Sequence, residues 1–141
     1  MNRIIGAIVA LAVVLFVATK GVRWWHELSN RELMQRSVQA YRAKLPRVVQ
    51  DGIVETRMEL VDRVVKTRYT VEPMFQTDPE TTAVFAKAMK NSICSDAAAV
   101  EVFEMGYSFD RTYEVRTPHG PDEFHVVAMA ADCPGVNVKK S

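Results

Sequence analysis

Hydrophobic and polar positions alternate along several stretches of the chain. A period of two residues is typical of a strand with one buried and one solvated face. The pattern predicts strands over 53–61, 64–71 and 107–116, and a more apolar strand over 124–131 that we expect to be central in its sheet. The positions expected to face the core are Val54, Thr56, Met58 and Leu60 in the first strand, Val65, Thr67, Tyr69 and Val71 in the second, and Tyr107, Phe109, Tyr113 and Val115 in the third.

Three helices are expected between and before these strands. A capping box begins the first helix, over 29–45, and Thr77-Asp78-Pro79 begins the second, which runs to about Ile93. Ser95 or Asp96 caps a short third helix, which we expect to open near Cys94. The apolar faces are predicted to contain Met34, Val38, Tyr41 and Leu45 in the first helix, and Val84, Phe85, Ala88 and Met89 in the second.

This order of elements predicts an α+β domain. Each strand pair is too closely spaced for a crossover, so we expect antiparallel hairpins in a small antiparallel sheet of about four strands (ββααββ), with the helices packed on one face. The expected organisation is a transmembrane anchor over 1–25, an amphipathic stalk helix over 26–47, the α+β domain over 48–133 and a flexible tail over 134–141.

The N-terminal segment Ile4–Ala18 contains no charged or polar side chain. With the residues that follow it, this run is just long enough to cross a bilayer, and Lys20, Arg23, Trp24 and Trp25 then fall at the membrane interface. A cleaved signal peptide is the alternative, although the residues around Ala18 fit a cleavage site poorly. We therefore expect an uncleaved, single-pass anchor.

Cys94 and Cys133 lie near opposite ends of the second half of the chain. Downstream of a secretion signal, two cysteines predict one disulfide bond. A zinc site with His119 and His125, or a Cys94 thiolate nucleophile, are the alternatives. The positive-inside count favours a cytoplasmic domain, but the cysteines favour the periplasm, and we follow the cysteines. The expected location is the bacterial inner membrane, with the C-terminal domain in the periplasm.

Net charge is only +1, which gives no nucleic-acid signal, but the charge is unevenly distributed. Residues 2–47 carry a net charge of +6, and residues 76–132 carry −6. Arg31, Arg36 and Arg42 on the stalk helix form a candidate binding face for anionic lipid or an acidic partner. An ordinary solvated helix face is the alternative.

Motifs for catalysis are missing from the sequence: there is no glycine-rich phosphate loop, HExxH, Gly-x-Ser-x-Gly or CxxC. Glu55 and Glu59 are predicted to share the solvated face of one strand. They could form a carboxylate pair for acid–base chemistry, but cross-strand ion pairing is the preferred interpretation.

Several residues of the second half give a resemblance to known proteins. Ile93-Cys94, Met105-Gly106-Tyr107, Tyr113, Gly120 and Asp132-Cys133 resemble, loosely, small bacterial envelope proteins in which one disulfide joins a helix to the last strand. Pilotin-like accessory proteins of secretion systems and prophage exclusion-type proteins include such shapes. No cysteine follows the apolar run, so the chain differs from lipidated pilotins.

These features predict a membrane-anchored periplasmic interaction module, accessory to an envelope assembly or a prophage-type exclusion system, and not an enzyme. The expected partners are membrane lipid and an envelope protein, with a homo-oligomer possible and no cofactor or nucleic acid. Two alternatives remain: a small hydrolase-like enzyme that uses Glu55 and Glu59 or Cys94, and a structural subunit of a membrane complex.

Overall fold

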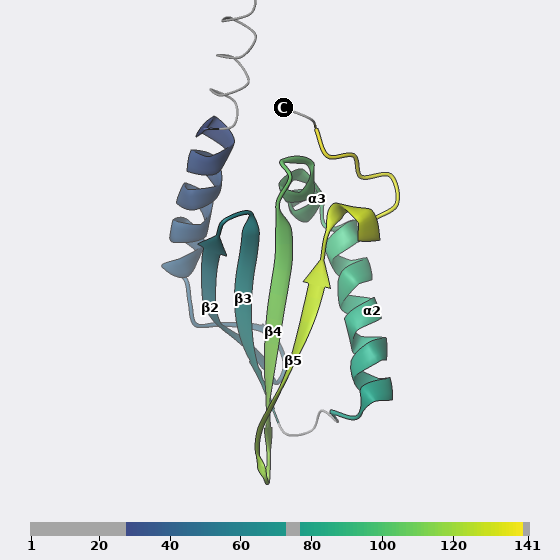
Figure 1. The fold of residues 1–141 in the computed structure, drawn as a ribbon. Coiled ribbons are helices and arrows are strands. Elements are labelled where there is room, and N and C mark those ends of the chain that lie inside the picture. Colours follow the sequence, from purple (N-terminus) through teal and green to yellow (C-terminus); the bar gives the residue numbers. More distant parts are fainter. Residues whose placement is uncertain (1–27, 73–76, 140–141) are drawn as a thin grey trace, which may run out of the picture. The chain divides into compact units, whose positions relative to one another are not determined.

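A five-stranded mixed sheet, in the order β1-β2-β3-β4-β5, forms the centre of the fold in the computed structural model (Figure 1). The structure describes residues 28–72 and 77–139. The described residues divide into two compact units, one that ends at Met34 and one that begins at Gln35. A helix covers residues 28–42. The labelled elements that follow are β1 (Arg47–Gln50), β2 (Ile53–Val61), β3 (Val64–Val71), α2 (Pro79–Ser95), α3 (Ala97–Glu104), β4 (Ser108–Thr117), β5 (Gly120–Ala128) and η1 (Ala130–Asp132).

The sequence predicted the α+β class and both hairpins correctly. β2 pairs antiparallel with β3 across Asp62, which adopts a positive φ of 54°, and β4 pairs antiparallel with β5. The prediction of a purely antiparallel four-stranded sheet is wrong, however. β3 and β4 pair in parallel, because α2 and α3 form the long connection that a parallel pair requires.

Two strands lie where the sequence did not place them. β1 is an additional edge strand, joined to β2 through Asp51-Gly52, where Gly52 takes the positive φ of 75° that such a turn requires. β5 is the other edge of the sheet and not its centre, and it begins at Gly120, before the predicted start. Val126 and Ala128 are buried, and Phe124 is partly buried, on the side of the strand that faces the helices, whereas Val127 is exposed. The apolar content of β5 therefore did not indicate a central position.

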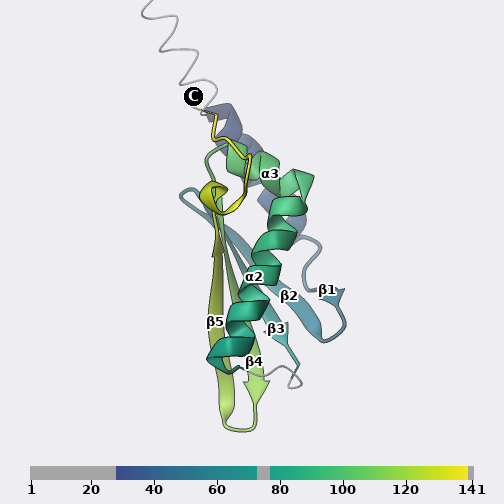
Figure 2. The ribbon, with the colours of Figure 1, turned by 90° about the vertical axis from the view of Figure 1, so that its right-hand side faces the viewer.

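Helices cover one face of the sheet, as predicted, and we call this the inner face (Figure 2). Tyr69, Tyr113 and Phe124 form a row of stacked rings across β3, β4 and β5 on this face. Phe85 of α2 packs edge-on against Tyr113 and Phe124, with ring centroids 4.9 and 5.6 Å apart. This aromatic cluster forms the main core with Val71, Val115 and Val126.

Asp78, within the predicted start signal, caps α2, and Asp96, one of the two predicted candidates, caps α3. Asp78 accepts a hydrogen bond from the Thr81 backbone N–H at 2.9 Å, and Asp96 accepts one from Ala98 at the same distance. Val84 and Ala88, predicted to lie on the buried face of α2, are instead exposed, because Phe85, Met89 and Ile93 make the packed face.

Cys94 lies in the last turn of α2 and does not open α3. Its disulfide with Cys133 lies in a second cluster that contains Ile93, Phe103 and Ala128. This cluster joins the ends of α2, α3 and β5.

Residues 134–139 were expected to be disordered, but the described part of this tail contacts the domain. Val136 packs against the disulfide cluster, and the Lys139 backbone N–H donates to the Glu104 carbonyl at 3.0 Å. The Lys139 ammonium also lies 2.9 Å from the Glu104 carboxylate. The described part of the tail therefore lies against the end of α3.

The predicted anchor, with Lys20, Arg23, Trp24 and Trp25, lies outside the described residues. Within 28–72 and 77–139, no helix has both the length and the apolar character needed to span a membrane.

Candidate functional site

The face of the sheet opposite the helices, which we call the outer face, carries a continuous polar network. The strand register sets it: Arg68 lies beside Thr112 and Thr112 beside His125, while Glu114 lies beside Glu123 in the next row. Each of these side chains is polar and stands on alternate strand positions, so the network follows from the period-two pattern combined with the pairing of the strands.

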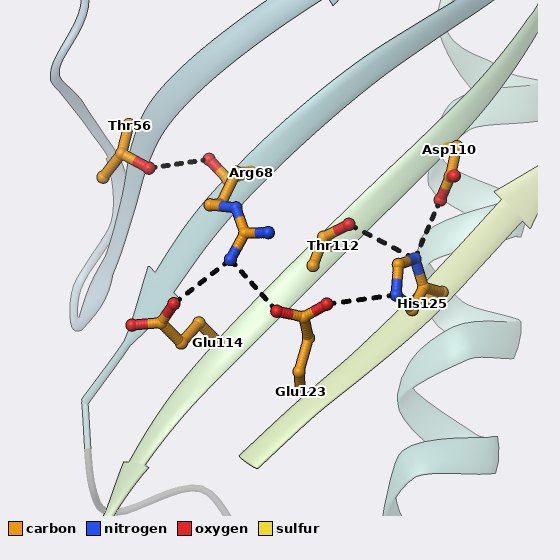
Figure 3. Close-up of polar contacts among 7 residues, drawn as sticks. All are labelled: Thr56, Arg68, Asp110, Thr112, Glu114, Glu123 and His125. Atoms are coloured by element: carbon orange, nitrogen blue, oxygen red, sulfur yellow. Dashed lines mark hydrogen bonds and ion pairs between the residues drawn. The ribbon is translucent and has the colours of Figure 1, made fainter. Parts of the chain in front are cut away.

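Arg68 joins two strands of this network (Figure 3). Its guanidinium nitrogen lies 3.2 Å from the Glu114 carboxylate and 3.0 Å from the Glu123 carboxylate. All three side chains are partly exposed, so water screens the pairs and each contributes about 1 kcal/mol or less to stability.

His125 extends the network along β5 (Figure 3). Its Nδ1 lies 3.2 Å from both an Asp110 carboxylate oxygen and the Thr112 hydroxyl, and its Nε2 lies 3.2 Å from a Glu123 carboxylate oxygen. The ring can donate to both carboxylates at once only as an imidazolium. The ring is half exposed and stands on an edge strand.

The outer face thus presents basic and acidic columns side by side. Lys66 and Arg68 stand on β3, and Asp110, Glu114 and Glu123 stand on β4 and β5, while on β2 Arg57 is paired with Glu59 at 3.1 Å. Partners that carry both signs of charge in a matching arrangement can be recognised by such a surface.

Glu55 does not belong to this face. A β-bulge between Glu55 and Arg57 turns Glu55 to the inner face, where only 1% of its surface is exposed, while Glu59 stays on the exposed side. The prediction that both glutamates share one solvated face is therefore wrong. The two carboxylates are separated by the sheet and do not form an acid–base pair.

The Glu55 carboxylate is held by side chains from three elements. The Tyr41 hydroxyl donates to it at 2.7 Å, the Tyr69 hydroxyl at 3.3 Å, and the Arg47 guanidinium lies 3.3 Å away and also contacts Tyr41. Arg111 of β4 places its guanidinium 5.8 Å from the centre of the Tyr69 ring, and its buried Nε has no partner among the described residues. This buried polar group joins Tyr41 to Arg47 of β1 and Tyr69 of β3.

Burial raises the pKa of Glu55 above its ordinary value of 4.5, although Arg47, the Tyr69 hydrogen bond and Arg111 act in the opposite direction. A carboxyl whose pKa is higher in the folded state stabilises the fold below its unfolded pKa. This contribution is lost as pH rises from about 4.5 through the raised pKa. Glu55→Gln keeps an acceptor but cannot ionise. Relative to the wild type, we therefore expect its free energy of unfolding to increase as pH rises through this window.

Urea unfolding of both proteins at several values between about pH 4 and 7 measures this difference. Glu59→Gln, which removes an exposed glutamate from the same strand, is the control. A Glu55→Gln difference that does not change with pH would contradict the role assigned to burial.

The remaining predicted site residues are placed as follows. Arg31, Arg36 and Arg42 are all exposed, and their contact with lipid or an acidic partner stays a prediction. Cys94 and Cys133 are bonded to each other, so neither offers a free thiol. His119 is an exposed turn residue. In the part of the chain that the structure describes, no cluster of His, Cys, Asp and Glu is placed to hold a metal ion.

The outer-face network was not predicted as a unit. Its signal was present in the sequence, because a turn at Pro118-His119 fixes Glu114 opposite Glu123 and Thr112 opposite His125. Arg68 could not be placed beside them, since that contact depends on the parallel pairing of β3 with β4.

Comparison with solved structures places this fold among bacterial proteins. A Pseudomonas aeruginosa protein described as secreted superposes with a TM-score of 0.60 at 10% identity, covering 76% of this chain and 95% of that chain. The type 2 secretion pilotin of Vibrio vulnificus superposes with a TM-score of 0.56 at 16% identity, covering 76% of this chain and 94% of that chain. At these identities the likeness establishes the fold alone. No protein-family model and no curated protein sequence matches the chain.

Proposed function

We propose that this chain is an accessory protein-binding module of the bacterial envelope, with its disulfide-bonded domain in the periplasm. The observation that carries the proposal is the shared fold with a type 2 secretion pilotin over nearly all of that protein's length. The Cys94–Cys133 bond supports an oxidising compartment, because such bonds are rare in the cytosol. Anchoring to the inner membrane through residues 4–18 is part of the same proposal.

The outer face of the sheet is the surface that we assign to the partner. Described elements cover the inner face, whereas the outer face presents the basic residues Lys66 and Arg68 of β3 beside acidic residues of β4 and β5. The expected partner is an envelope protein whose docking segment carries acidic and basic residues in the complementary order. This assignment places recognition on Arg68, Glu123 and His125.

Site-specific photo-crosslinking in the native bacterium tests the proposal. The full chain carries a photoreactive residue at Lys66 on the outer face or, as a control, at the exposed Lys87 of α2. We expect one defined protein adduct from Lys66 and none from Lys87. Equal adducts from both positions, or none from Lys66, would contradict the docking assignment.

Arg68→Gln and His125→Gln provide the matching functional variants. Because exposed ion pairs contribute little, we expect the free energy of unfolding to change by about 1 kcal/mol or less. The yield of the Lys66 adduct should nevertheless fall severalfold. Arg68→Gln removes a basic charge from the outer face, and His125→Gln removes the ring that contacts Glu123. Lys87→Gln controls for the loss of a surface charge, and a variant that unfolds would be recognised by its far-UV circular dichroism.

A further inference from the structure

The turn that carries Cys133 is connected to α2 by a contact other than the disulfide. The Lys90 ammonium of α2 lies 3.2 Å from the carboxylate of Asp132, the residue before Cys133. The second Asp132 oxygen accepts a hydrogen bond from the Met129 backbone N–H at 2.9 Å, which shapes the η1 turn beside the end of α2 (Figure 1). Lys90 precedes Cys94 by four residues, so both stand on the same side of α2. The pair aligns the turn of Cys133 with the helix turn of Cys94.

Packing on both sides of Cys133 adds to this connection. Ala130 precedes it and Val136 follows it, and both pack against the second buried cluster. Beyond them the Lys139 backbone N–H donates to the Glu104 carbonyl of α3 at 3.0 Å. These contacts do not involve the covalent bond, and the Cα atoms of the two cysteines lie 5.2 Å apart. We therefore expect the two thiols of the reduced chain to stay close together.

The two cysteines differ in their access to solvent. Cys133 is buried, with 4% of its surface exposed, in the cluster that contains Ile93 and Phe103. Cys94 is partly exposed in the last turn of α2, where its neighbour Ser95 is exposed. Thiol–disulfide exchange depends on the access of the reacting sulfur. A reagent in solution therefore reaches Cys94 far more readily than Cys133.

We propose that Cys94 is the residue through which this chain exchanges thiols with a disulfide-bearing oxidant, and that Cys133 closes the native bond in a second step. Oxidation then follows folding, because the fold itself brings the two thiols together. The inference does not rest on the proposed function, since it uses only the bond and its immediate surroundings.

The exchange proceeds in two steps. The Cys94 thiolate attacks one sulfur of the oxidant's disulfide, so a mixed disulfide forms at Cys94 and the other oxidant sulfur leaves as a thiolate. The Cys133 thiolate then attacks Cys94 Sγ, so the native bond forms and the second oxidant sulfur leaves. The two cysteines lose two electrons and the oxidant gains them. The two thiol protons of the chain end on the two released thiols.

The second step is the slower one because Cys133 lies among apolar side chains. Such surroundings disfavour the charged thiolate, and only the thiolate attacks. The mixed disulfide at Cys94 should therefore persist long enough to be detected. Reduction by an external thiol is hindered for the same reason, because attack at Cys94 expels the Cys133 thiolate into the cluster.

Alkylation of the reduced full chain in mild detergent tests the difference between the two thiols. The bond is opened with excess dithiothreitol, the reductant is removed without air, and a limiting amount of N-ethylmaleimide is added to the native protein. Peptide mapping should show that Cys94 reacts about tenfold faster than Cys133, because Cys94 is the more accessible thiol. In urea, which removes the fold, the two rates should become nearly equal.

Oxidised glutathione is the probe for the mixed disulfide. Cys133→Ser removes the closing thiol, so the glutathione adduct should accumulate at Cys94. Cys94→Ser lacks the same bond and is the matched control, with about tenfold less adduct expected at Cys133. Far-UV circular dichroism checks that both variants fold, and the alkylation experiment needs no substitution if either does not. In the native bacterium, the mass of the adduct trapped by Cys133→Ser distinguishes a protein oxidant from a small disulfide.

Equal alkylation of the two thiols in native buffer would overturn the proposal, because Cys133 would then be accessible or the fold would be lost on reduction. Faster alkylation of Cys133 would overturn it as well. So would a glutathione adduct on Cys94→Ser as large as the adduct on Cys133→Ser. None of these measurements involves the outer face, so their failure is separate from a failure of the crosslinking experiment at Lys66.

Discussion

Replacing either cysteine of the Cys94–Cys133 pair with serine is expected to lower the free energy of unfolding by about 2–5 kcal/mol. The bond links residues 39 positions apart and joins the last turn of α2 to the segment after η1. A loop of this length restricts the unfolded chain by roughly 4 kcal/mol in the chain-entropy account. Cys133 is also buried beside Ile93 and Phe103, so a serine hydroxyl there lies among apolar groups.

Chemical denaturation of the single variants and of Cys94→Ser with Cys133→Ser measures this effect. The double variant should be only slightly less stable than either single one, because all three lack the same covalent bond. Additive losses would show that the serines act through packing and not through the bond. Alkylation of unreduced protein taken directly from cells, followed by mass spectrometry, determines whether the bond is closed there. Two alkylated thiols would contradict the proposed periplasmic location.

The alternation of side chains predicted the buried faces of the two central strands. Val65, Thr67, Tyr69 and Val71 are all buried in β3, and Tyr113 and Val115 are buried in β4. Regular, fully paired strands keep their period of two from end to end, so their faces can be read from the sequence.

β2 shows why this reasoning fails where a strand is irregular. The bulge between Glu55 and Arg57 inserts an extra residue, so Val54 and Met58 lie on opposite faces although the pattern places them together. The burial of Glu55 depends on this shift and on the Tyr41 and Tyr69 hydroxyls, which donate hydrogen bonds to its carboxylate. The period-two pattern reveals neither the bulge nor the tyrosine partners of Glu55.

The order of the strands in the sheet also could not be predicted from the local pattern of hydrophobic and polar residues. Two hairpins joined by helices can meet through several edges, and the choice of β3 beside β4 comes from packing α2 and α3 on one face. The short β1 has no alternation to detect, although Asp51-Gly52 is a strong hairpin signal that was present in the sequence. The polar outer-face network depends on both features, and it therefore emerged only with the fold.

Tyr113→Ala is expected to lower the free energy of unfolding by about 3–5 kcal/mol, the range for removing a large buried aromatic side chain. Tyr113 is only 1% exposed and lies at the centre of the inner-face row. Its ring stacks on Tyr69 at 4.8 Å and on Phe124 at 5.2 Å, and the edge of Phe85 meets it at 4.9 Å. Alanine would leave a cavity among three strands and α2 that rigid neighbouring strands cannot close.

Tyr113→Phe distinguishes the contribution of the ring to stability from that of the hydroxyl. It keeps every aromatic contact and removes only the hydroxyl, which is hydrogen-bonded to Arg111, so the expected loss is about 1 kcal/mol, the usual value of one hydrogen bond. Val84→Ala on the exposed side of α2 serves as the control and should change stability by about 0.5 kcal/mol or less. Urea unfolding of the three variants at one pH gives this ranking directly. Because the stack connects β3, β4 and β5 in one row, a small effect of Tyr113→Ala would mean that the parallel β3–β4 pairing does not organise the core.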